Sequence, residues 1–316
     1  MNIKRKIAIA AVPAVMALAS TSVDSKILLM SQEGWEVSFD GAANAFVMKN
    51  SVSNVPDSSG GTPNLTFDTY GGVMAGNDDT SIVTGLLPNV WGMTLKAPTA
   101  NGLDMSARLG LYTHMNGGEN SLGNGEINIR ETSGSISGSF GTVLVGRSLG
   151  IHQSNAILND MLLFGVGAAA SAGNSNTTLG RIGLGYLYTD FKPQISWTLP
   201  GMDALNGNFG AKIGIFDPDD IVADDARSSA TDKHAPRVEA QITYNGDIGD
   251  LGVNLWVDGS YQNTERNAAQ AAFHTNFQRV GALTATTNVG QVGDTDVDSA
   301  AVGFGTKLSY QGFAIV

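Results

Sequence analysis

Strict alternation of apolar and polar residues is the feature that most constrains how this chain folds. In six segments, apolar side chains take every second position, and polar or small ones lie between them. Successive side chains of a β-strand point to opposite faces, so this pattern predicts strands with one apolar and one polar face. The six segments are 35–39, 91–97, 103–111, 209–215, 237–244 and 302–310.

Four further segments are predicted to be strands with a less regular pattern: 126–137, 142–147, 186–199 and 251–261. Pro193 interrupts the third of these, and Trp256 falls on the polar face of the fourth. With a strand beginning at Phe313, the sequence predicts ten strands and the start of an eleventh.

Composition supports an all-β chain and excludes several functions. Glycine accounts for 40 of 316 residues, charged residues make up 15%, and there is no long apolar run. The net charge of −11 argues against nucleic acid as a partner, because phosphate binding needs clustered Lys and Arg. Cysteine is absent, which rules out disulfides, thiolate metal sites and a Cys nucleophile.

The N-terminus has the three parts of a secretory signal peptide. Lys4, Arg5 and Lys6 precede an apolar stretch, 7–18, and Ala17-Leu18-Ala19 matches the small-x-small cleavage pattern. A membrane anchor is the alternative, but the stretch is shorter than the ~20 residues that a spanning helix needs. We therefore expect 1–19 to be a cleaved signal and 20–316 to form the mature β-domain.

Cations gather on the polar faces of the predicted strands. They are Lys96, Arg108, Arg130, Lys212, Arg237 and Lys307. A soluble β-sandwich would place such charges toward water. A membrane barrel would turn its apolar face to lipid and its charged face to a watery lumen.

The lengths of the connections favour the barrel. Long connections at 49–90, 114–124, 148–185, 217–236 and 262–299 alternate with short ones, such as 98–102 and 245–250. Outer-membrane barrels have short turns at one end and long loops at the other. Greek-key sandwiches have no reason to keep this alternation.

Specific residues then point to a family. The segment 138–147, GSFGTVLVGR, places a Phe-Gly turn before a strand that ends in Gly-Arg, directly ahead of the third long connection. It resembles the Gram-negative porin family, as do 34–41 and 107–112. The resemblance implies a transmembrane antiparallel up-and-down β-barrel, of 16 strands in a complete family member.

The resemblance also implies a function. Porins form water-filled channels for passive diffusion of ions and small hydrophilic solutes, and their third loop folds inward to narrow the pore. Here that loop runs from 148 to about 185, and Asp160 is its acid. Arg108 and Arg130 are the best candidates for the facing wall, with Arg147 weaker because alternation places it with Val143 and Val145. Lys96, Lys212 and Arg237 are expected along the lumen.

Ion preference stays open at this level. The polar strand faces are basic, which favours anions, whereas the loops are acidic. The acids cluster at Asp217, Asp219, Asp220, Asp224, Asp225 and Asp232, in what we take to be a solvated loop without the pattern of a calcium site. Glycines at 303 and 305 fall on one face, where they would let a loop or a neighbouring subunit approach closely.

The chain departs from the family at its end. Family members end on an aromatic residue, usually Phe, whereas this sequence stops at Val316 inside a predicted strand. Since bacterial single-chain barrels have even strand numbers, an odd count favours a truncated sequence over a smaller barrel.

Other classes have less support. An enzyme has less support because the four histidines, His114, His152, His234 and His274, all fall in long connections and have no metal-site spacing. An exported structural or adhesive β-protein without a channel is the remaining alternative. We expect no cofactor or metal; the expected partners are outer-membrane lipid, solutes in transit and, from the resemblance, two further copies in a homotrimer.

Overall fold

The computed structural model describes nine ranges of the chain: 26–50, 79–115, 127–165, 185–219, 231–232, 235–266, 279–280, 283–284 and 296–316. The predicted signal peptide, His234 and His274 lie outside these ranges, as do Asp220, Asp224 and Asp225.

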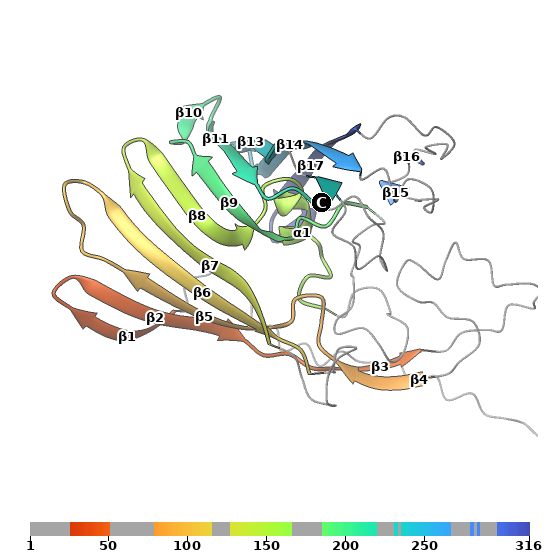
Figure 1. Ribbon diagram of the computed structural model, residues 1–316, viewed down its shortest axis with the longest axis horizontal. Coiled ribbons are helices and arrows are strands. Elements are labelled where there is room, and N and C mark those ends of the chain that lie inside the picture. Colours follow the sequence, from red (N-terminus) through yellow and green to blue (C-terminus); the bar gives the residue numbers. More distant parts are fainter. Residues whose placement is uncertain are drawn as a thin grey trace, which may run out of the picture.

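One long antiparallel sheet contains most of the described residues (Figure 1). Twelve of its strands pair in the order in which they follow along the chain, and two short ones attach at its margins. The twelve are β1 (Ile27–Gln32), β2 (Trp35–Ala42), β5 (Asn89–Lys96), β6 (Asp104–Thr113), β7 (Ile127–Gly138), β8 (Gly141–Leu149), β9 (Phe191–Thr198), β11 (Gly207–Phe216), β13 (Arg237–Ile248), β14 (Leu251–Arg266), β17 (Asp296–Tyr310) and β18 (Phe313–Ile315).

The remaining elements are short. β10 (Met202–Ala204) pairs with β11, and β12 (Thr231–Asp232) pairs with β14. Two separate hairpins are formed by β3 (Phe46–Asn50) with β4 (Asp79–Val83), and by β15 (Arg279–Val280) with β16 (Leu283–Thr284). The helix α1 (Ser154–Leu158) follows β8, and no helix in the described ranges is long and apolar enough to cross a membrane.

Every predicted strand is present, but alternation did not predict β1, the first strand of the long sheet, or the short strands β3, β4, β10, β12, β15 and β16. β1 reads ILLMSQ, with four consecutive apolar residues and no alternation, and all six of its residues are exposed. It nonetheless pairs with β2, with an irregularity between Leu28 and Met30. The predicted count of ten strands and part of an eleventh was therefore too low, and the argument from an odd strand number loses its premise.

The alternation of long and short connections is confirmed. The tight turns after β1, β7, β13 and β17 have two residues each, whereas 150–190 separates β8 from β9. In the turns Glu33-Gly34 and Gln311-Gly312, both residues have positive φ, between 47° and 87°. Such turns match the right-handed twist of the flanking strands, so they join neighbours with little splaying.

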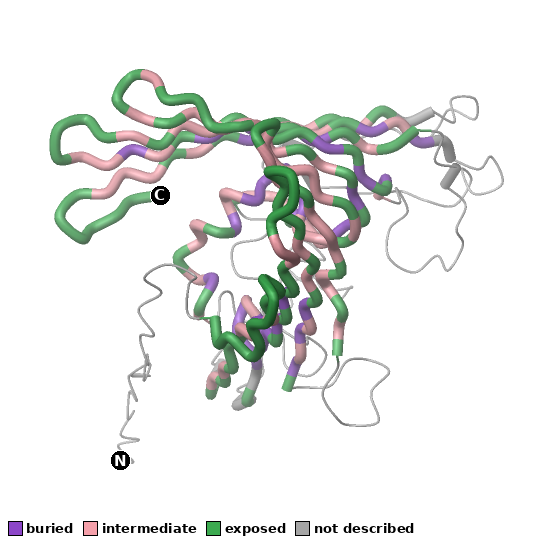
Figure 2. Tube along the Cα trace, turned by 90° about the vertical axis from the view of Figure 1, so that its left-hand side faces the viewer, coloured by how far each residue is buried: buried purple, intermediate pink, exposed green. Residues whose placement is uncertain are grey.

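Burial in the sheet is inverted relative to a soluble protein. Figure 2 shows the sheet bending steeply, so that its two halves face a common inner space. Polar side chains on that inner face are buried, with Thr94 and Gln194 each 7% exposed and Gln241 3%. Apolar side chains on the opposite face are open, with Ile195 and Val257 each 55% exposed. A soluble sandwich buries its apolar face, so the sandwich alternative is wrong and the outer-membrane barrel pattern holds.

A β-bulge explains why β7 alternates poorly. Gly110 pairs with Glu131 and Leu111 with Ile129, which leaves Arg130 as an extra residue without a cross-strand partner. The open apolar positions accordingly shift from Ile127 and Ile129 before the bulge to Ile136 after it. The bulge turns both Arg130 and Glu131 toward the inner face, which two adjacent residues of a regular strand cannot do.

Two glycines on β17 make room on the inner face, as their shared face suggested. A Cβ at Gly303 would overlap Gln153 Nε2, from the segment after β8, and a Cβ at Gly305 would overlap the indole of Trp256. Trp256 lies on the polar face of β14 and is only 4% exposed because its ring lies across Gly305.

Gly305→Ala is expected to destabilise the protein by about 1–3 kcal/mol, because the added methyl group displaces a buried indole. Urea unfolding of the detergent-refolded protein, followed by tryptophan fluorescence, measures the change. Gly134→Ala on β7 is the control, since the nearest atom to its added Cβ is Ser106 O at 3.7 Å. Equal loss in both variants would contradict the proposed packing.

Candidate functional site

The segment 150–165, which we call the strap, leaves β8 and crosses the inner face of the sheet. Its first residues are held by two carboxylates. Glu239 Oε2, on β13, accepts the backbone N–H groups of Ile151 and His152 at 2.8 and 2.9 Å. Asp258 Oδ1, on β14, accepts the backbone and side-chain amides of Gln153 at 3.1 and 3.2 Å.

The carboxylates of Glu239 and Asp258 are almost completely buried, at 1% and 3% residue exposure. His152 adds a further contact, with its Nδ1 atom 2.6 Å from Asp258 Oδ1. A buried carboxylate is costly unless it is paired or hydrogen-bonded, and charge-assisted bonds are among the strongest in proteins. The beginning of the strap is therefore firmly fixed to β13 and β14.

The far end of the strap is fixed to another part of the sheet. Leu86 and Leu87, just before β5, donate backbone hydrogen bonds to Gly165 O and Leu163 O at 2.9 and 3.1 Å. Leu86, Ile157 and Leu163 form a small buried apolar cluster. Since β6, β7, β8, β9 and β11 lie between β5 and β13, the strap spans the inner face. This placement agrees with the expected inward fold of the third long connection.

Asp160 lies on the strap, and both of its carboxylate oxygens accept hydrogen bonds. One comes from the strap itself and the other from the segment that precedes β9. Oδ2 accepts the Tyr186 hydroxyl at 2.6 Å, and Oδ1 accepts the Leu162 N–H at 2.8 Å. Burial, followed by the hydrogen bond to Asp160, raises the pKa of Tyr186 well above its usual range. The phenol is protonated at neutral pH and donates to Asp160, and this bond helps shape the strap.

Arg108 lies on the inner face of β6 between two acids. Its Nη1 and Nη2 atoms donate to the two oxygens of Asp40 at 2.9 and 3.0 Å, and its Nε donates to Glu131 at 3.0 Å. The side chain crosses β5 at Gly92, where a Cβ would lie 2.7 Å from Nη2. The wall at Arg108 is thus charge-compensated, which corrects the picture of a purely basic strand face.

Arg130, placed inward by the bulge, makes different contacts. Its Nη2 lies 3.3 Å from His114 Nε2, and its guanidinium carbon lies 5.1 Å from the centre of the Tyr112 ring and 5.8 Å from that of Phe191. Cation–π contacts of this kind stabilise an arginine without cancelling its charge. Arg108 and Arg130 therefore share the inner face but have different surroundings.

The other predicted lumen cations, Arg237, Lys212 and Lys96, lie in different parts of the sheet and have different contacts. Arg237 is on the inner face of β13, where it donates to Glu239 and Asp219, each at 2.7 Å. Lys212 shares the face of its cross-strand neighbours Thr198 and Gln241 and, within the described ranges, makes no ion pair or hydrogen bond. Lys96 is exposed at the short-turn end of β5, opposite Glu36, and is remote from the strap.

Arg147 does not face the lumen, and that expectation was wrong. It pairs directly with Pro193 on β9, and its neighbour two positions back, Val145, pairs with Ile195. Directly paired residues share a face, and Ile195 is on the open apolar face. The alternation that links Arg147 with Val143 and Val145, and that made it the weaker candidate, agrees with this outward position.

Asp219 was expected to be a solvated loop residue, but its side chain forms ion pairs with two cations of the sheet. It folds back onto the inner face, where its Oδ2 atom lies 2.7 Å from both Lys192 Nζ and Arg237 Nη1. Asp217 remains exposed. In the part of the chain that the structure describes, no three His, Cys, Asp or Glu side chains are grouped as a metal site.

Sequence reasoning missed the acids of the inner face: Asp40, Glu131, Glu239 and Asp258. Each occupies the polar face of its strand, but so does every other polar residue there, and alternation gives no indication of partners. The phase shift of apolar residues along β7 is the one signal that could have placed Glu131, because it marks the bulge.

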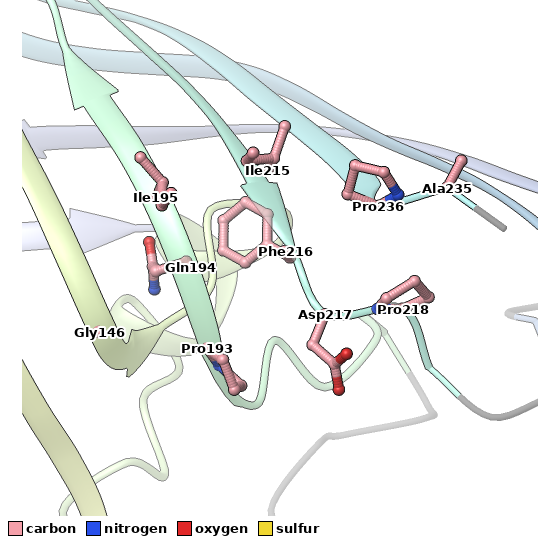
Figure 3. A pocket seen from close by; sticks show the side chains of 10 residues that line it. All are labelled: Gly146, Pro193, Gln194, Ile195, Ile215, Phe216, Asp217, Pro218, Ala235 and Pro236. Carbon is pink, nitrogen blue, oxygen red and sulfur yellow. The ribbon is translucent and has the colours of Figure 1, made fainter. Parts of the chain in front are cut away.

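A shallow depression of about 560 Å³ lies at the loop ends of β9 and β11 (Figure 3). It is lined by Ile195 and Ile215 of the apolar face and by Pro193, Pro218 and Pro236. Asp217 is its one ionisable lining residue. Because Ile195 and Ile215 belong to the open apolar face, we assign this depression to the outer side of the sheet.

Glu239→Ala is expected to loosen the beginning of the strap, because two buried N–H groups lose their acceptor. A loss of about 1–3 kcal/mol corresponds to amide exchange about 5–150 times faster at Ile151 and His152. Hydrogen–deuterium exchange of the refolded protein measures it. Glu36→Ala, which removes an exposed carboxylate on β2, should leave exchange in the strap unchanged. Unaltered protection at Ile151 in Glu239→Ala would rule out the anchor.

Comparison with a solved structure agrees with this architecture. The chain is similar to the outer membrane channel DcaP of Acinetobacter baumannii, with a TM-score of 0.50 and 14% sequence identity over 89% of this chain. The match spans 62% of the length of that channel. At this identity the likeness concerns the fold. No curated protein matches the chain.

The family comparison extends over nearly the whole sequence. The Gram-negative porin family model matches residues 7–314, which include every strand described above except the last residue of β18. The match agrees with the all-β sheet, its open apolar face and the inward strap. The chain is a member of the Gram-negative porin family, with its place in the outer membrane.

Proposed function

We propose that this porin forms a water-filled channel for passive diffusion of ions and small hydrophilic solutes. The observation that carries the proposal is the buried polar face of the sheet, crossed by a strap that is fixed at both ends. Polar side chains on the inner face replace part of the hydration that an ion loses when it leaves bulk water. The strap crosses this face and is expected to narrow the channel.

The proposed constriction combines the wall and the strap. Arg108 and Arg130 supply the wall on β6 and β7, and Asp160 is the acid of the strap. Because Asp40 and Glu131 compensate Arg108, we expect only a weak ion preference. Lys212, like Lys307, lies on the inner face, and its ammonium group makes no ion pair or hydrogen bond within the described ranges, so it is expected to contribute to any preference for anions.

Maturation and assembly remain predictions. Cleavage after Ala19 would be checked by N-terminal sequencing of the protein recovered from outer membranes. The homotrimer is expected from family membership, and the mass of the detergent-solubilised complex, measured with the bound detergent subtracted, distinguishes it from a monomer.

Single-channel recording tests the proposal. The full-length protein is refolded in detergent and inserted into a planar bilayer. Stepwise currents whose conductance rises in proportion to bulk salt are expected for a water-filled channel. A correctly folded protein, by circular dichroism, that gives no channels would overturn the proposal and favour the structural or adhesive alternative.

Lys212→Gln is expected to shift the reversal potential in a salt gradient toward cations, because it removes an uncompensated positive charge from the lumen. Arg147→Gln removes the same charge from the outward face and should leave the reversal potential unchanged. The two variants carry the same net charge, so a shift of equal size in both would contradict the assignment of these faces.

A further inference from the structure

Two buried cations converge on a single carboxylate oxygen beside the strap. Lys192 is on β9 and Arg237 on β13, the strands on either side of β11. Their side chains are 7% and 14% exposed, and both lie 2.7 Å from Asp219 Oδ2. Lys192 has no other ion pair or hydrogen bond within the described ranges.

The carboxylate comes from outside the sheet. Asp219 belongs to the segment that follows β11, and Gln262 of β14 holds its backbone. The Gln262 Oε1 atom accepts the Asp219 N–H at 3.0 Å, and its Nε2 donates to the Asp219 carbonyl at 3.1 Å. The Asp219 side chain is 46% exposed, so an accessible carboxylate covers two buried cations.

The balance of charges shows why an anion is needed between Lys192 and Arg237. Arg237 has a second partner in Glu239, with Nε 2.7 Å from Oε1, but Lys192 depends on Asp219. A buried ammonium group without a partner is costly. An ammonium and a guanidinium that converge on one point match the oxygen atoms of a carboxylate, which accept charge-assisted hydrogen bonds.

We propose that Lys192 and Arg237 form a binding site for small carboxylate anions, which Asp219 occupies when no solute is bound. A solute carboxylate then displaces the Asp219 side chain and takes over its contacts, while Gln262 still holds the Asp219 backbone. The site borders the narrowed region, because Glu239, the second partner of Arg237, also holds Ile151 and His152 of the strap. This inference rests on the proposed channel function.

Asp219→Ala tests the proposal by vacating the site, and Asp217→Ala is the control in the same segment. In planar bilayers, the anion-to-cation permeability ratio of Asp219→Ala should rise severalfold, and its current in potassium acetate should saturate with concentration. The double variant Asp219→Ala with Lys192→Met, in which both members of the pair are removed, should lose the saturation. Asp217→Ala should behave like the unmodified protein.

Acetate binding is also measured without any channel activity. Added acetate should raise the Tm of detergent-refolded Asp219→Ala, and above the dissociation constant the Tm should rise with the logarithm of the acetate concentration, since a ligand of the native state stabilises it. The same concentrations of chloride, and the double variant with acetate, should give no such rise.

These measurements separate the two proposals. If the unmodified protein conducts no ions, the channel function fails, and the Tm series still decides whether the site binds carboxylates. If channels form but acetate neither saturates the current nor raises the Tm of Asp219→Ala, the binding site is refuted. A change in the permeability ratio alone also refutes it, because this is the effect of lost charge without binding.

Discussion

Hydrocarbon offers no hydrogen-bond partners, and this constraint determines most of the structure. Every backbone N–H and C=O that crosses the membrane needs a partner within the protein, and strands obtain one only from neighbouring strands. The antiparallel order of twelve strands supplies such partners between each pair of neighbouring strands, with short turns at one end. The apolar side chains then lie on the face toward lipid, and the polar ones are buried.

Burial of the polar face has its own consequence, because buried charges need partners. The inner face therefore contains linked ion pairs. Arg108 lies between Asp40 and Glu131, and Arg237 joins Asp219 to Glu239. Glu239 also accepts hydrogen bonds from two backbone N–H groups of the strap, which links the strap to these ion pairs. The same residues that compensate charge on the wall thus hold the segment that narrows the inner space.

Glycines permit these contacts where side chains have to cross a strand. Gly92 lets Arg108 reach Asp40 over β5, and Gly303 lets Gln153 of the strap approach Asp258. The bulge at Arg130 has a comparable role, since it gives the inner face two neighbouring charged residues. Glycine content and irregular alternation, which weaken a strand in isolation, here serve the packing of the polar interior.

The sequence by itself determined most strands of the long sheet, their faces and the order of long and short connections, because each depends on residues close together in the chain. Alternation even placed Arg147 on the outward face. Only the tertiary structure decided the partners: Arg108 meets Asp40 across 68 residues, and Ile151 meets Glu239 across 88. Those contacts depend on strand register and on the bend of the sheet, which local patterns do not encode. The physical reason is that a polar side chain on the inner face has many possible partners, and the shape of the sheet selects among them.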